Sequence, residues 1–234
     1  MKAIPPEELL GPALMCFAER GLQGTSIDYL TQTLGVSHRV FYDVLGNKAA
    51  AIEAVYQYAT KLLLAEQPAP PPAWERLQAY LDRWWHRTAA AAQAHPHAFT
   101  FWQYYRTSPH VAGQAVLGPF SPVVDLIAQT LARPGTYAAG ALPLAVLGRS
   151  LAAQWTAAVE VVLAEPACQT SAALRQRVLT QAYTSCWQGL GLPQNLLVTV
   201  GKTPPLSPLM ELLGNALVQR FGPTPAAPAP EPGK

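Results

Sequence analysis

Hydroxyl and cationic side chains gather between residues 25 and 48, and groups of these types can contact DNA. Hydroxyls and helix N-termini donate hydrogen bonds to phosphate oxygens. Arginine can bind guanine through two parallel hydrogen bonds, which makes Arg39 the base-contacting candidate. The predicted DNA-binding residues are Thr25, Ser26, Ser37, His38, Arg39, Tyr42 and Lys48.

Two short helices joined by a tight turn must position these groups. Thr25 is predicted to cap the first of them, with Asp28 as its capping-box partner. Gly35 permits the sharp turn because glycine adopts positive φ without a steric penalty. Ser37 is predicted to cap the second helix. Such a helix–turn–helix places its second helix in the major groove of DNA, so the sequence favours a transcriptional regulator.

Helices also flank this unit on both sides. Apolar residues at spacings of three and four predict a helix over residues 7–20. Asn47 is predicted to cap a helix that runs to about residue 66. The proline-rich stretch 67–73 then breaks the helical pattern.

Most of the remaining chain also has helical periodicity, and alternating segments are too few for a sheet. The predicted fold class is therefore all-α. The expected helices cover residues 74–94, 96–106, 111–117, 119–131, 138–164, 171–190 and 208–221, and 195–200 is a candidate extended segment. The predicted parts are a helix-turn-helix domain (1–48), a linking helix (49–66), a proline-rich break (67–73), a helical ligand-binding and dimerisation domain (74–221) and a disordered proline- and alanine-rich tail (222–234).

The N-terminal quarter of the chain resembles the TetR-type regulators. Their pattern is matched with its spacing preserved at Phe17, Ala18, Gly21, Thr25, Ser26, Ile27, Leu30, Gly35, Val36, Ser37, Tyr42 and Lys48. The chain departs from that pattern at Arg39, where the family has glycine, and at Val44–Leu45, where it has His-Phe. The resemblance implies a three-helix DNA-binding domain, followed by a helical domain that binds a small-molecule effector and forms a homodimer.

Within the family such proteins usually repress transcription and release a pseudo-palindromic operator of double-stranded DNA when the effector binds. Residues 147–155 and 171–190 resemble the family's final helix pair, which forms a four-helix interface between subunits. Beside the resemblance, the Tyr42 hydroxyl can donate to a phosphate, and Lys48 lies at a helix N-terminus whose unpaired N–H groups can bind another. The competing interpretations are a core position for Tyr42 and an ordinary helix-start position for Lys48.

The charge of the N-terminal part weakens the expectation of DNA binding. Five Lys and Arg face seven Asp and Glu before residue 67, and Asp43 lies on the predicted DNA-contacting helix. Phosphate neutralisation dominates most DNA affinity, so this balance predicts modest binding. An alternative is a protein of the same architecture that has lost DNA binding and acts as a ligand-binding or scaffold protein.

Aromatic side chains concentrate in the predicted second domain, residues 74–221. An apolar or aromatic effector with one polar group is expected there, because ligand sites combine apolar linings with few polar groups. The competing interpretation, which we favour, is that aromatic residues at helical spacing form the core. The candidate ligand-binding residues are Trp84, Trp85, Phe99, Trp102, Tyr105 and Trp155.

Several other classes of function find little support in the sequence. No phosphate-binding loop, nucleophile elbow or useful carboxylate pair is present, so catalysis and cofactors are not expected. His95 and His97 lack the further ligands that a metal site needs and fit surface or helix-cap positions better. The three cysteines are widely spaced and are expected to be buried thiols. No signal peptide or membrane span is evident, so we expect a cytoplasmic protein.

Overall fold

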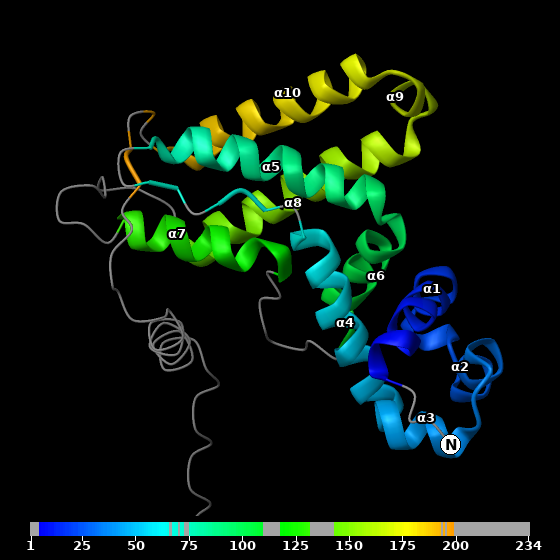
Figure 1. The fold of residues 1–234 in the computed structure, drawn as a ribbon. Coiled ribbons are helices and arrows are strands. Elements are labelled where there is room, and N and C mark those ends of the chain that lie inside the picture. Colours follow the sequence, from blue (N-terminus) through cyan, green and yellow to red (C-terminus); the bar gives the residue numbers. More distant parts are fainter. Residues whose placement is uncertain are drawn as a thin grey trace, which may run out of the picture. The chain divides into compact units, whose positions relative to one another are not determined.

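The structure is a computed structural model that describes residues 5–65, 67–69, 71–72, 75–109, 118–131, 143–192, 194 and 196–198. These residues form α-helices with one short 3-10 helix, which confirms the all-α prediction (Figure 1). They belong to one compact unit, Met1–Val200. The elements are α1 (Pro6–Gly24), α2 (Ile27–Leu34), α3 (His38–Leu45), α4 (Lys48–Leu64), α5 (Leu77–Ala94), α6 (Pro96–Arg106), η2 (Gly118–Phe120), α7 (Ser121–Leu131), α8 (Leu144–Ala164), α9 (Pro166–Thr170) and α10 (Ala172–Leu190).

The first three helices pack around a small apolar centre. Phe17 of α1, Leu30 of α2 and Phe41 of α3 are fully buried there. Burying each such side chain contributes about 1.5–3 kcal/mol. The turn between α2 and α3 is made by Gly35 in the left-handed region, as predicted. This centre fixes the direction of α3, the helix that carries the candidate DNA contacts.

Side-chain caps begin three consecutive helices. The Ser26 hydroxyl accepts from the Tyr29 amide, Ser37 from Val40, and the Asn47 side chain from Ala50. The predicted caps at Ser37 and Asn47 are therefore confirmed. The predicted cap at Thr25 is wrong, because the chain turns into α2 one residue later.

Helix α4 connects the N-terminal helices to the larger helical part. Its residues Val55, Ala59 and Leu63 are buried along one side. Helices α1 and α4 both pack against α6, so the N-terminal helices and the larger part belong to the same unit. The functional division into a DNA-binding and a ligand-binding domain stays a prediction.

Helices α5, α6, α8 and α10 form the larger part, with α8 and α10 packed along each other (Figure 1). Helix α6 has the predicted bounds, whereas α5 begins at Leu77 rather than at residue 74. The short helix α9 was not predicted. Residues 111–117, 208–221 and the tail 222–234 lie outside the described residues.

An isolated antiparallel bridge lies in the segment 195–200, which was expected to be extended. Arg76, just before α5, pairs with Leu197. The Leu77 amide donates to the Leu196 carbonyl and the Val198 amide to the Glu75 carbonyl, each at 2.8 Å. The bridge therefore fixes the segment after α10 to the start of α5.

Candidate nucleic-acid interface

The outward side of α3 carries four polar side chains, which we call the α3 face: His38, Arg39, Tyr42 and Asp43. The side chain of Arg39 is 92% exposed and that of Asp43 is 69% exposed. The opposite side of the helix buries Phe41 and Leu45. The amphipathic pattern of eight residues therefore divides α3 between the core and solvent.

Both basic side chains of the α3 face have carboxylate partners. The His38 Nε2 atom lies 2.7 Å from the Oδ1 atom of Asp28 on α2. The Arg39 Nε atom lies 3.8 Å from the Oδ2 atom of Asp43, one turn along α3. Because all four side chains are largely exposed, these pairs contribute little to stability. They do reduce the positive potential that the face offers to phosphates.

Tyr42 combines an exposed hydroxyl with a ring held against the domain. The residue is 49% exposed, and its ring packs edge-on against Phe41 at a centroid distance of 5.8 Å. The competing prediction of a core position is therefore wrong. A hydroxyl in this position can donate to a phosphate while the ring limits its motion.

Helices α2, α3 and α4 each begin with a side-chain cap. In the caps the Ser26 and Ser37 oxygens act as acceptors, so each hydroxyl hydrogen can still be donated to a phosphate. Backbone amides at these ends add positive potential. Lys48 is the first residue of α4, as predicted.

Thr25 has a structural position instead of an interfacial one. It is fully buried, and its hydroxyl donates to the Gly21 carbonyl at 2.8 Å and approaches the Cys16 carbonyl at 3.3 Å. The side chain thus closes the end of α1, and it has no surface to offer to a phosphate. The assignment of Thr25 to the DNA-binding surface is corrected accordingly.

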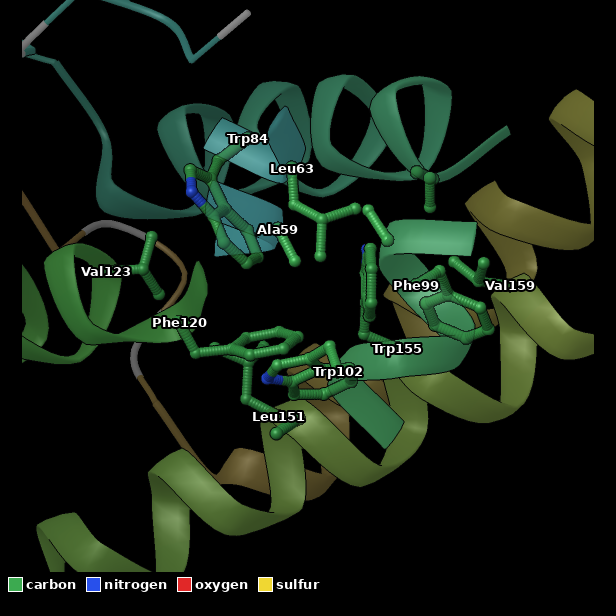
Figure 2. Packing of buried hydrophobic residues seen from close by; sticks show 14 of the residues in the cluster. Ala59, Leu63, Trp84, Phe99, Trp102, Phe120, Val123, Leu151, Trp155 and Val159 are labelled. Carbon is green, nitrogen blue, oxygen red and sulfur yellow. The ribbon is translucent and has the colours of Figure 1, made fainter. Parts of the chain in front are cut away.

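Four of the six predicted ligand-binding residues meet in the larger part. The ring of Phe120 in η2 contacts those of Trp84, Trp102 and Trp155, and Trp155 also contacts Phe99 and Trp102 (Figure 2). These five residues are called the aromatic cluster. All five are at most 3% exposed. In this structure the predicted residues pack on each other as core, and ligand binding by them stays a prediction.

The rings of the other two predicted residues pack outside the cluster, although the Trp155 indole N–H donates to the Trp85 backbone carbonyl at 3.3 Å. Trp85 packs against Tyr183 of α10. Tyr105 stacks on Tyr56 of α4 with a centroid distance of 4.1 Å and donates its hydroxyl to Glu53. Burial and the adjacent Glu53 carboxylate raise the pKa of Tyr105. Tyr105 therefore connects α6 to α4 and does not line the same site as Trp155.

Three features of the structure were not found from the sequence. Asp28 pairs with His38 across two helices, and Phe120 fills the centre of the aromatic cluster. The third is an open groove of about 620 Å³ between α8 and α10, here called the α8–α10 groove. Its apolar lining includes Ala157, Ala158, Val161, Leu174, Val178 and Ala182.

Two further observations concern other classes of site. None of the helices in the described ranges is long and apolar enough to cross a bilayer. Cys16, Cys168 and Cys186 are buried free thiols, as expected. Burial raises the pKa of the Cys186 thiol to about 12, which keeps it protonated and unreactive at neutral pH.

Comparison with known proteins gives matches by structure. No family model and no curated protein matches the chain. A protein assigned to the TetR family of transcription regulators from Shewanella sp. PV-4 superposes with a TM-score of 0.62 at 20% identity, covering 83% of this chain and 98% of its own. A TetR-like transcriptional regulator from Rhodococcus sp. RHA1 gives a TM-score of 0.53 at 15% identity, covering 82% and 98%. The chain thus has the fold of these TetR-type proteins.

Proposed function

We propose that this chain, built on the TetR-type fold, is a homodimeric transcriptional regulator whose binding to a pseudo-palindromic operator is relieved by a small apolar or aromatic effector. The observation that carries the proposal is the α3 face. Its four polar side chains stand on a helix whose other side is anchored in the core. A recognition helix needs this combination of exposed contacts and a rigid support.

The expected mode of DNA binding relies on hydrogen bonds as much as on charge. The hydroxyls of Ser26, Ser37 and Tyr42 and the capped N-termini would contact phosphates. Arg39 and Lys48 of two subunits would neutralise about four phosphates, which predicts a slope of log affinity against log salt of about −4. Binding should therefore be modest in strength and only moderately sensitive to salt.

The α8–α10 groove supports the proposed homodimer. Its alanines allow close approach of another helix, and Val161 in its lining is 49% exposed. A second copy that docks by the same two helices would cover the apolar lining and form a four-helix interface. That pairing would hold two copies of α3 on one side of a duplex.

A variant pair on α8 tests the interface. Val161→Asp should convert the dimer to a monomer in sedimentation analysis and weaken operator binding, because it buries a charge at the groove. Val146→Asp is the matched control, since Val146 is also exposed on α8 but does not line the groove. Equal behaviour of the two variants would reject this groove as the interface.

The aromatic cluster and its surroundings support the effector part of the proposal. The rings supply a large apolar surface, and the Trp84 and Trp102 indole N–H groups have no hydrogen-bond partner among the described residues. An aromatic effector that bears an acceptor could satisfy such donors. A panel of aromatic compounds, screened for release of selected operator DNA, tests this step.

A second candidate is a protein of this fold that has lost DNA binding. Asp28 and Asp43, the carboxylate partners of His38 and Arg39, favour it, because their negative charges lower the positive potential of the α3 face. Selection from a random DNA pool with the purified protein separates the candidates. Enrichment of one palindrome establishes the regulator, and absence of enrichment at low salt establishes the alternative.

A further inference from the structure

We propose that Arg39 and Asp43 act as one base-reading unit, which requires a guanine for Arg39 and a cytosine for Asp43 in each operator half-site. This inference rests on the proposed regulator function and specifies the DNA that it would bind. The carboxylate, which weakens general DNA binding, then becomes the group that selects the sequence.

The contact between the two side chains leaves their base-reading atoms free. It joins the Arg39 Nε atom to the Asp43 Oδ2 atom at 3.8 Å. The two terminal nitrogens of Arg39 remain available for the O6 and N7 acceptors of guanine. The Asp43 Oδ1 atom remains available as an acceptor. The contact therefore involves neither the terminal nitrogens of Arg39 nor the Oδ1 atom of Asp43, which are the atoms that would contact the bases.

The charge of Asp43 restricts what can lie opposite it. The side chain is 69% exposed on the C-terminal half of α3, so in the groove it would face either phosphates or base edges. Phosphates repel it, as do the acceptor atoms of guanine and thymine. The cytosine N4 amino group donates in the major groove and is the usual partner of a carboxylate. Adenine also donates, but its N7 acceptor lies beside that donor.

The other polar groups on α3 are less suited to select the base sequence than Arg39 and Asp43. His38 is already paired with Asp28 on α2, and Arg39 is the only Lys or Arg in α3. The ring of Tyr42 packs against Phe41, so Tyr42 offers its hydroxyl rather than its ring to DNA. Base selection by charged groups of α3 therefore depends on Arg39 and Asp43.

The helical spacing limits the separation of the two bases. Four residues of α-helix rise about 6 Å, and neighbouring base pairs are about 3.4 Å apart. The guanine and the cytosine should therefore lie within about two base-pair steps of each other. In a symmetric dimer the same arrangement is repeated in the second half-site.

Parallel selections from a random DNA pool test the inference. Wild type should enrich a palindrome whose half-sites hold a guanine and a cytosine within two steps. Asp43→Asn should lose the cytosine preference by about 5- to 150-fold while its affinity for unrelated DNA rises, because a repulsive charge is removed. Arg39→Ala should lose the guanine preference. Circular dichroism confirms that each exposed-site variant is folded.

Glu19→Gln is the matched control, because it removes the same charge from an exposed position on α1. It should leave the selected sequence unchanged. If wild type enriches a palindrome and Asp43→Asn selects the same one, the inference is overturned and the regulator function stands. If wild type enriches no sequence, both are overturned. If Asp43→Asn loses the cytosine preference and Glu19→Gln keeps it, the inference is supported.

Discussion

The α3 face and the aromatic cluster are held in place by opposite means. Arg39 and Asp43 extend into solvent, and only the helix beneath them fixes their position. In the cluster, Trp155 is fully buried, and its ring meets those of Phe99, Trp102 and Phe120 at centroid distances of 5.2–6.1 Å. Substitutions on the α3 face should therefore alter recognition without altering stability, whereas in the cluster the two effects are combined.

The largest effect is expected from Trp155→Ala. Removing a fully buried indole leaves a cavity among three rings, and such changes lower the free energy of unfolding by about 3–5 kcal/mol. Urea denaturation followed by circular dichroism measures the loss. Trp155→Phe retains one ring and should lose clearly less. A loss below about 1 kcal/mol for Trp155→Ala would show that the cluster is not a tightly packed core.

Gly118→Ala should have the next largest effect. Gly118 has a φ of +51°, and a β-carbon at this position would overlap the Trp102 Nε1 atom. The overlap forces the rigid indole or the η2 turn to move, which costs about 1–3 kcal/mol. Gly189→Ala on α10 is the control, because no neighbouring atom lies within 4 Å of its added carbon. Equal urea midpoints for the two variants would contradict the expected overlap.

Ser37→Ala should have a smaller effect on stability and a specific effect on recognition. Losing this cap costs about 1 kcal/mol, and the proposed phosphate donor is lost with it. Ser171→Ala removes an equivalent cap from α10, far along the chain from α3. Both variants should lose similar stability, but only Ser37→Ala should weaken operator binding. Equal operator affinity in both would remove Ser37 from the interface.

Local signals explain which parts of the α3 face could be predicted from the sequence. The caps at Ser37 and Asn47 and the turn at Gly35 depend on a few adjacent residues, and they were predicted correctly. The cap of α2 was placed one residue early, because Thr25 and Ser26 are both good caps. Only the packing of Thr25 against the end of α1 decides between them.

Contacts between distant segments explain what was not predicted. The helical spacing of Trp84, Phe99 and Trp102 indicates that these residues are buried, but it does not predict which rings contact each other. Phe120 lies in a three-residue 3-10 turn that has no periodicity to reveal its burial. The pairing of Asp28 with His38 likewise depends on the angle between α2 and α3. Local structure was therefore more predictable than the composition of either site.

The smallest effect on stability, and the sharpest test of the contrast, is expected from Arg39→Ala. The side chain is 92% exposed and its only ion pair with another described residue is a weak one within α3, so the free energy of unfolding should change by less than about 0.5 kcal/mol. Operator affinity should nevertheless fall, because the guanine contact and one phosphate-attracting charge per subunit are lost. Lys61→Ala removes the same charge from an exposed position near the end of α4. Unchanged affinity for the selected operator at moderate salt would show that α3 does not use Arg39 to bind DNA, whereas a loss confined to Arg39→Ala would separate recognition from folding at a single side chain.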